Sequence, residues 1–144
     1  MAYKEIVYCT DFSENADAAF FAALELAEKD NAKLWILHVL PPPINPMDAE
    51  WDVPNHPKEA LVLQLQERMQ QDYGDQVSSS VPYELVVLDG HISTEILKFL
   101  REYPIDLCVM GAYGMTSMGL VIFGSIAKRV SHRAPCSVMI VRMR

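Results

Sequence analysis

The stretch that most constrains the fold is residues 105–130, IDLCVMGAYGMTSMGLVIFGSIAKRV, where an apolar segment runs into glycines and then into a helical pattern. Gly111 and Gly114 follow the apolar segment. Both can adopt a positive φ and allow close approach of the backbone, because they carry no Cβ. Gly124 and Ser125 then begin a predicted helix, whose unpaired N–H groups and dipole favour an anion. This order predicts a phosphate-binding turn at the end of a buried strand.

The same stretch also fits a plainer interpretation, in which a strand, a loop and a helix only pack together. Three glycines and a serine at this spacing are more specific than two glycines alone, so we favour the phosphate site. A Walker loop is excluded, since it requires Gly-x4-Gly-Lys-Ser/Thr and no lysine stands beside Gly124 or Ser125. The turn is therefore expected to hold a nucleotide without a built-in group for transferring its last phosphate.

Strand and helix patterns alternate along the whole chain. Strands buried on both faces read as continuous apolar runs, and helices show apolar residues at i, i+3 and i+4. This alternation predicts an α/β, Rossmann-like fold, an open five-stranded parallel sheet with right-handed crossovers and helices on both faces. The expected strands are 6–9, 34–40, 83–88, 105–110 and 137–143, and four helices complete a single domain of residues 1–144.

The predicted helices have recognisable ends or apolar faces. Ser13 is the expected N-cap of the first helix, which ends near Asn31, and Pro104 marks the end of the third. Gly74 is a natural stop for the second helix. The apolar stripe expected to face the sheet in the first helix is Ala16, Phe20, Ala23 and Ala27. In the second helix the apolar positions Leu61, Leu65 and Met69 recur every four residues, and in the third Ile92, Ile96, Phe99 and Tyr103 share a face.

Composition and charge limit the classes of function. The chain has 144 residues and a formal net charge of −7, which argues against a general nucleic-acid or anionic-membrane surface. Its first residues lack a signal-peptide pattern, and no apolar run is long enough to insert across a bilayer. The three cysteines have no CxxC spacing. We expect a cytoplasmic protein with reduced thiols.

Residues 41–57 form the least regular stretch and hold six of the nine prolines. Proline at this density opposes both helices and strands, so a long loop is expected. It is either a solvated linker or a lid or partner surface, because long loops in compact domains are often functional. In the lid interpretation Trp51 shields the adenine end of a nucleotide, while Asp48, Glu50 and Asp52 keep the loop away from the phosphates.

In open parallel sheets, ligands bind outside the carboxyl ends of the strands, where the strand order reverses. That rule brings Asp11, Val39 and the turn from Gly111 to one edge, although they lie far apart in the sequence. Asp11 has two interpretations, a cap for the following helix or a ligand contact at the mouth of the crevice. We favour the ligand contact.

These motifs together resemble the universal stress proteins, whose ATP-binding members carry the spacing Gly111-x2-Gly114-x9-Gly124-Ser125. The resemblance covers essentially the whole chain, from KEIVYCTDFS through ILHV and IDLCVMGAYG to GSIAKRVSHRAPCSVMIV. It implies a strand order of 3-2-1-4-5, a homodimer joined along the C-terminal strand, and a nucleotide-binding regulatory role in the stress response.

Position by position, the resemblance implies a nucleotide site. Asp11 would hydrogen-bond the ribose or adenine of ATP, and Val39 would contact the base. The glycine positions would hold the phosphates, with Mg²⁺ or Mn²⁺ if a divalent ion accompanies them. One departure is Ser137, where the family often has proline, and it concerns the dimer edge more than the pocket. The full expected set is Thr10, Asp11, Val39, Met110, Gly111, Gly114, Gly124, Ser125 and Ile126.

Other chemistries find little support in the sequence. A Gly-x-Ser-x-Gly elbow is absent and Ser125 and His132 share one helix, which argues against a serine hydrolase. His38 and His91 are expected to be structural, and no cluster has metal-ligand spacing. We expect a nucleotide-binding module without catalytic residues, at most a weak ATPase, with a possible protein partner that the sequence does not identify. The alternatives are a slow phosphoryl- or adenylyl-transfer enzyme and a nucleotide-free stress scaffold.

Overall fold

The structure is a computed structural model that describes residues 2–41, 57–112 and 124–143. All five strands are parallel and form one sheet in the order β3-β2-β1-β4-β5, which confirms the predicted fold and strand order. The chain reverses its direction of travel across the sheet between β1 and β4. The strands are β1 (Glu5–Cys9), β2 (Lys33–Leu40), β3 (Tyr83–Asp89), β4 (Leu107–Gly111) and β5 (Ser137–Val141).

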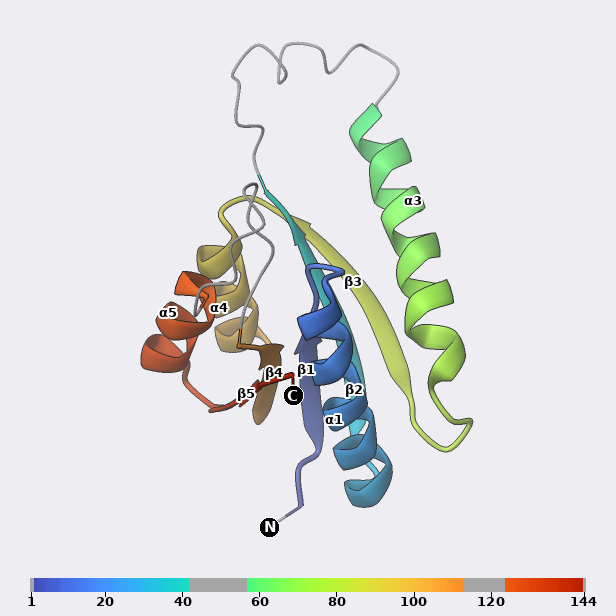
Figure 1. Ribbon diagram of the computed structural model, residues 1–144, viewed down its shortest axis with the longest axis vertical. Helices are drawn as coiled ribbons and strands as arrows, with labels where there is room; N and C mark the ends of the chain where they lie inside the picture. The colour runs from blue at the N-terminus through green and yellow to red at the C-terminus, as the bar shows by residue number, and fades with distance from the viewer. Residues whose placement is uncertain (1, 42–56, 113–123, 144) are drawn as a thin grey trace.

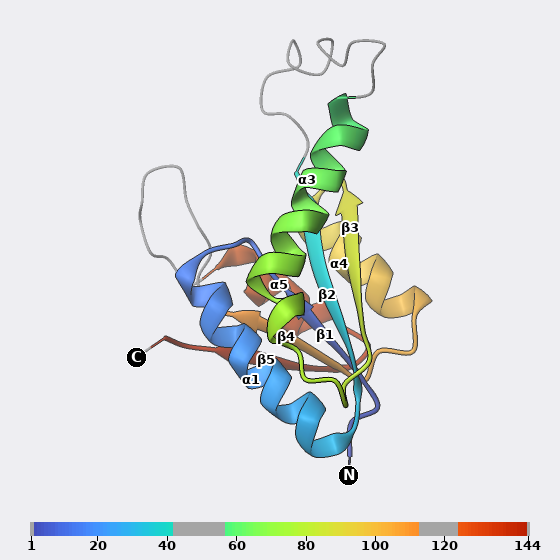
Figure 2. The same ribbon diagram turned by 90° about the vertical axis from the view of Figure 1, so that its right-hand side faces the viewer.

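Within the described ranges, four α-helices cover the two faces of this sheet. Figure 1 shows α4 and α5 on one side and α1 and α3 on the other, and Figure 2 shows α1 and α3 in front of the sheet. Among the described residues, no helix has the length and apolar character needed to cross a membrane. The helices are α1 (Glu14–Asp30), α3 (Pro57–Asp72), α4 (Ile92–Glu102) and α5 (Ser125–Arg133), and a short 3-10 helix, η1 (Gly74–Gln76), follows α3.

Each face of the sheet has its own hydrophobic core, because successive side chains of a strand point to opposite faces. In β1, Ile6 and Tyr8 belong to the core under α1 and α3, whereas Val7 and Cys9 belong to the core under α4 and α5. All four side chains are buried. Helices on both faces therefore explain why this strand reads as an unbroken apolar run.

Helix α1 begins and ends where the sequence predicts. Ser13 is the N-cap, and its Oγ accepts a hydrogen bond from the Ala16 N–H at 3.2 Å. Asn31 closes the helix in the left-handed conformation, with φ at 54°, which asparagine tolerates better than most residues. The Ser13 cap therefore fixes the start of α1 shortly after β1, at the carboxyl edge of the sheet.

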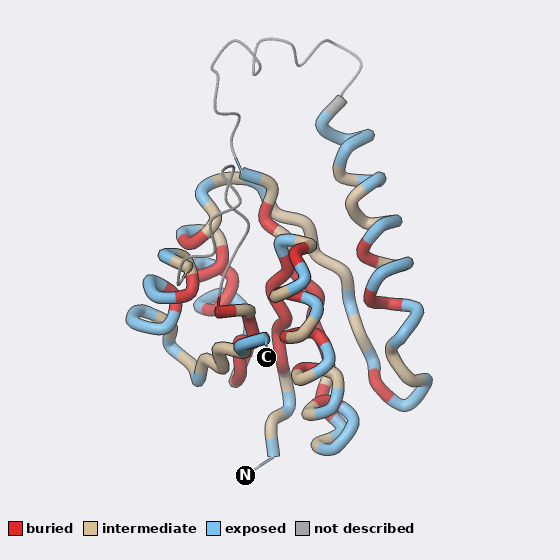
Figure 3. Tube along the Cα trace, viewed as in Figure 1, coloured by how far each residue is buried: buried red, intermediate tan, exposed pale blue. Residues whose placement is uncertain are grey.

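Only the C-terminal half of α3 is well packed within the described structure. Met69 is fully buried, but Leu61 is 39% exposed, although both lie on the apolar face that the periodicity marks. Figure 3 shows the corresponding change along α3, from an exposed N-terminal half to a partly buried C-terminal half. Periodicity identifies the apolar face of a helix, but it does not say how much of that face meets the sheet.

Two predicted helix ends differ from the structure in detail. Gly74 is buried and does not adopt a positive φ; α3 ends at Asp72, and Gly74 begins the 3-10 turn that continues the chain toward β3. Helix α4 ends at Glu102, so Tyr103 lies outside it and is 42% exposed. Tyr103 still stacks on Phe99, with ring centroids 4.4 Å apart.

Candidate functional site

The carboxyl ends of β1 and β4 lie next to each other at the point where the strand order reverses. Beyond β1, the Thr10 N–H donates to the Leu37 carbonyl of β2 at 2.9 Å. Beyond β4, the Ala112 N–H donates to the Val141 carbonyl of β5 at 2.8 Å. The two connections therefore leave the sheet in opposite directions, and ligands bind at such a point in this class of fold.

Gly111 lies directly under the start of α1. A Cβ at Gly111 would lie 3.0 Å from the carbonyl oxygen of Asn15 and 3.1 Å from its carbonyl carbon. Gly111 does not have the positive φ that the sequence analysis allowed for, and its role is to permit this close approach. The absence of a side chain therefore allows the first turn of α1 to approach the end of β4 closely.

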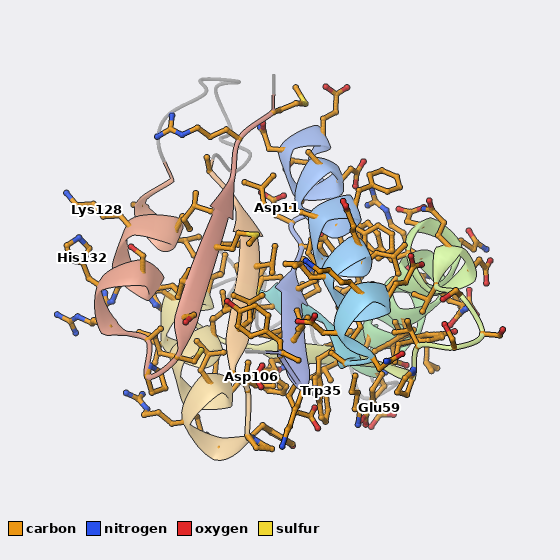
Figure 4. The ribbon with its side chains drawn as sticks, turned by 90° about the horizontal axis from the view of Figure 1, so that it is seen from below. Asp11, Trp35, Glu59, Asp106, Lys128 and His132 are labelled. Atoms are coloured by element: carbon orange, nitrogen blue, oxygen red, sulfur yellow. The ribbon has the colours of Figure 1, made fainter. Side chains whose placement is uncertain are left out.

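The β1–α1 turn, residues 10–13, is held by its own side chains. Thr10 Oγ1 accepts a hydrogen bond from the Phe12 N–H at 2.9 Å, and Asp11 Oδ1 accepts one from the Ser13 N–H at 3.0 Å. Phe12 adopts a left-handed conformation with φ at 64°. Asp11 thus supports the turn without capping α1, whose N-cap is Ser13, and its side chain is also exposed before the start of α1 (Figure 4).

The Thr10 side chain points toward the α1–α3 layer. Its Oγ1 lies 2.7 Å from the Tyr73 hydroxyl, which donates to Asp17 Oδ1 at 2.9 Å. Burial raises the pKa of Tyr73 to about 12, so this hydroxyl keeps its proton at neutral pH. Thr10 is itself buried, so only its main chain is well placed to meet a ligand at the edge.

The start of α5 offers main-chain donors close to the end of β4. The Gly124 N–H donates to the Ala112 carbonyl at 2.8 Å, and the first bond within the helix runs from the Lys128 N–H to the Gly124 carbonyl at 3.0 Å. The N–H groups of Ser125, Ile126 and Ala127 therefore have no acceptor inside α5. Such groups, at the positive end of the helix dipole, suit an anion.

The remaining predicted residues are either buried beneath the edge or outside the described residues. Val39 and Met110 lie near the ends of β2 and β4, but both belong to the core under α4 and α5 and are only 5% and 6% exposed. Gly114 lies outside the described residues, as do Trp51 and the carboxylates of the expected lid. The structure thus brings to one edge Thr10, Asp11, Gly111, Gly124, Ser125 and Ile126, with Val39 and Met110 beneath it.

The described residues contain no group of three His, Cys, Asp or Glu side chains that could hold a metal ion. Ser125 and His132 lie on the same helix, and Figure 4 shows His132 beside Lys128 on the outer side of α5. His91 is the N-cap of α4, and its Nδ1 lies 3.0 Å from Thr94 Oγ1. A hydrolytic triad thus finds no support in this part of the chain.

The cysteines are free thiols in the structure. Cys9 and Cys108 are buried side by side on β1 and β4, with 3.9 Å between their sulfur atoms. The interaction with Cys9, together with burial, raises the pKa of the Cys108 thiol. Burial also raises the pKa of Cys136 to about 11, so Cys108 and Cys136 are poor candidates for a nucleophile, and the Cys9 side chain is buried.

Four residues that shape the edge were not identified from the sequence. Phe12, Asn15, Arg68 and Tyr73 each act through a partner on another element, and no local pattern marks them. Arg68 of α3 places its guanidinium carbon 4.1 Å from the centre of the Phe12 ring. The left-handed turn at Phe12 is unusual for a bulky residue and carries no glycine or asparagine signal.

Comparison with known proteins gives one consistent result. The model of the universal stress protein family matches residues 2–142. Universal stress protein MJ0531 of Methanocaldococcus jannaschii is 28% identical over 97% of this chain and 82% of its own length. The solved structure of UspA from Lactobacillus plantarum is 27% identical, with a TM-score of 0.79 and 99% of each chain covered.

A further solved structure shares the fold. It is a universal stress protein in complex with cAMP, 23% identical, with a TM-score of 0.70 over 99% of this chain and 98% of that one. The family match extends over nearly the whole chain, the strand order is the one that the resemblance implied, and Gly111 and Gly124 lie at the predicted edge. The chain therefore belongs to the universal stress protein family.

Proposed function

We propose that this protein is an ATP-binding regulatory module of the stress response, a cytoplasmic protein whose ATP-bound state alters its assembly or its contact with a partner. The observation that carries the proposal is the placing, at one sheet edge, of Asp11, Gly111 and the main-chain donors at the start of α5 that have no acceptor within that helix. A carboxylate suits the sugar hydroxyls, and helical N–H groups suit the phosphates. One neighbour in the fold is a complex with cAMP, an adenine nucleotide.

Each end of the nucleotide would meet a different kind of group. Asp11 is exposed beside the crevice and would accept hydrogen bonds from the ribose or adenine. Gly111 and Gly114 would leave room for the phosphates, and the amides of Ser125 and Ile126 would donate to them. Any Mg²⁺ or Mn²⁺ would be bound mainly by the phosphates, since the described residues hold no ligand cluster of their own.

The nucleotide-binding part is tested with one substitution in the glycine turn. Gly114→Val would add a branched side chain where the phosphates are expected to approach, so we expect ATP affinity measured by calorimetry to fall by at least about tenfold. Gly74→Ala, in the η1 turn before the amino end of β3, is the matched control and should bind ATP as the wild type does. Unchanged affinity in a folded Gly114→Val protein would contradict the assignment.

We also propose that ATP is hydrolysed slowly or not at all. Phosphoryl transfer depends on positioned cations and on a group that orients the attacking water, and the predicted turn has no adjacent lysine. Steady-state turnover with Mg²⁺ or Mn²⁺ should stay far below about 1 per second, a common enzyme rate. Faster metal-dependent turnover would favour the phosphoryl- or adenylyl-transfer alternative. A purified protein that neither retains nor binds an adenine nucleotide would favour the scaffold.

The homodimer is the third part of the proposal. β5 pairs with β4 on one side only within the described chain, and its residues from Val138 to Val141 are half-buried and apolar. An apolar edge of this kind favours pairing with a second copy across a two-fold axis. Because the Val141 carbonyl bonds to β4, the main-chain groups of Ile140 point to the outer edge.

This geometry gives a clean test of the dimer. Ile140→Pro removes an outward N–H without removing a bond to β4, so the monomer should stay folded while the dimer weakens. Light scattering should then show a dimeric wild type and a largely monomeric variant at micromolar concentration. A monomeric wild type under the same conditions would exclude the dimer while leaving nucleotide binding open to its own test.

A further inference from the structure

Phe12 stands in a conformation that bulky residues rarely adopt. Its φ of 64° is left-handed, and such conformations cost a non-glycine residue roughly 1–2 kcal/mol. Strain of this kind persists only where surrounding contacts determine it, and it is concentrated at functional sites. Phe12 lies between Asp11, the proposed nucleotide contact, and Ser13, the N-cap of α1.

The contacts that hold Phe12 come from two other elements. Its ring centroid lies 4.7 Å from that of His38 on β2 and 6.3 Å from that of Tyr73, just after α3. The Arg68 guanidinium of α3 lies over the ring at 4.1 Å. The Phe12 ring therefore packs against the His38 ring, the stacked Tyr73 ring and the Arg68 guanidinium.

His38 also forms a hydrogen bond with the main chain of the same turn. Its Nδ1 lies 2.8 Å from the Thr10 carbonyl oxygen, which can only accept, so Nδ1 carries the proton and donates. Burial lowers the pKa of His38, against smaller opposing effects from the Thr10 carbonyl and the Asp11 carboxylate. The ring is therefore neutral at physiological pH, with its single N–H committed to Thr10.

We propose that His38 and Arg68 are positioning residues for Asp11, because they hold Phe12 in the left-handed conformation that aims the Asp11 carboxylate at the nucleotide crevice. The inference rests on the proposed nucleotide site and extends it to α3, an element that the glycine pattern does not reach. If Phe12 is released, the turn can relax toward negative φ. The bond from the Ser13 N–H to Asp11 Oδ1 is then lost, together with the fixed direction of the carboxylate.

The first test measures ATP affinity by calorimetry. Phe12→Gly keeps a residue that tolerates positive φ but removes the ring, so the turn becomes free and affinity should fall by about tenfold. Arg68→Met removes the cation but keeps the stem, and a loss of about two- to fivefold is expected for an exposed cation–π contact. Arg68→Lys should restore most of it. Arg101→Met, an exposed arginine of α4 on the opposite face, is the control and should change nothing.

A double-mutant cycle separates positioning from a general structural effect. If Phe12 acts through Asp11, the Phe12→Gly change should weaken ATP binding by less than about twofold once Asp11 is replaced by alanine. Equal losses in the wild-type and Asp11→Ala backgrounds would overturn the proposal.

A second readout needs no nucleotide. Amide hydrogen exchange at Ser13, followed by NMR in the ligand-free protein, should become several-fold faster in Phe12→Gly and His38→Leu, because the Asp11 side chain no longer accepts that N–H. Unchanged exchange at Ser13 would overturn the positioning role. Faster exchange in a protein that fails to bind ATP would support the positioning role and contradict the proposed function, so the two failures are distinguishable.

Discussion

The two connections that meet at the carboxyl edge of the sheet are built in different ways. The β1–α1 turn is held by side chains, with Thr10, Asp11 and Ser13 each accepting a main-chain N–H. The described ends of the β4–α5 connection are held by main-chain bonds, and at Gly111 by the absence of a side chain. Substitutions in the β1–α1 turn should therefore act by removing hydrogen-bonding partners. Substitutions at the ends of the β4–α5 connection should act by adding atoms where there is no room for them.

The largest effect is expected where space is tightest. Gly111→Ala would place a methyl group 3.0 Å from the Asn15 carbonyl oxygen, and neither β4 nor the start of α1 can move freely. The free energy of unfolding, measured by urea denaturation, should fall by about 1–3 kcal/mol. Gly74→Ala is the comparison, because the atoms that its Cβ would meet belong to the flexible Gln70 side chain. If Gly74→Ala cost as much as Gly111→Ala, space under α1 would not be the deciding feature.

The second-largest effect on stability is expected where the β1–α1 turn loses a hydrogen-bonding partner. Tyr73→Phe removes the hydroxyl that bonds both Thr10 and Asp17, which should lower the free energy of unfolding by about 1–2 kcal/mol. Tyr103→Phe is the matched control, since Tyr103 is 42% exposed and no hydrogen bond of its hydroxyl is found in the described structure. Equal stability of the two variants in thermal unfolding would argue against a side-chain-built turn.

A pair of serine substitutions compares the two helix starts directly. Ser13→Ala removes the N-cap bond to Ala16 and should cost about 1 kcal/mol. Ser125 is exposed and the start of α5 has no side-chain cap, so Ser125→Ala should change stability by less than about 0.5 kcal/mol. Chemical denaturation of both variants measures the difference, and a Ser125→Ala cost as large as that of Ser13→Ala would remove the contrast.

The smallest effect is a dependence on pH. Burial lowers the pKa of His38 below its ordinary value, so the unfolded chain binds a proton more readily than the folded one. Stability should therefore be complete above about pH 6.5 and decline as the pH falls toward the lowered value. The decline between pH 7 and pH 5 should be shallower in His38→Gln than in the wild type. His132→Gln, an exposed histidine of α5, should keep the wild-type slope.

The sequence predicts those parts of the fold that depend on local pattern. β1 and β2 are recognisable because both of their faces are covered, and α1 is recognisable because Ser13 and Asn31 cap it. The predicted strand order rests on the family resemblance, because a short apolar run does not show which strands lie beside it in the sheet. The structure confirms it.

The sequence could not predict features that depend on contacts between distant segments. Phe12 is left-handed because His38, Arg68 and Tyr73 surround it, and none of these is close in sequence. The reason for a glycine at position 111 is likewise a contact with α1 and not its own φ. The nucleotide-binding role of the predicted residues stays a prediction, to be tested with the variants of the glycine turn.

The hydrogen bond between the Gly124 N–H and the Ala112 carbonyl has a consequence for design. It holds Ala112 and Gly124 next to each other, although they lie twelve positions apart in the sequence. Closing a loop between fixed ends costs only about 0.6 kcal/mol more for each doubling of its length. Sequences of different length should therefore close between these two residues at little cost in stability. The protein could then serve as a scaffold in which the proposed ATP site is exchanged for another ligand site by replacing the stretch between Ala112 and Gly124, Gly114 included.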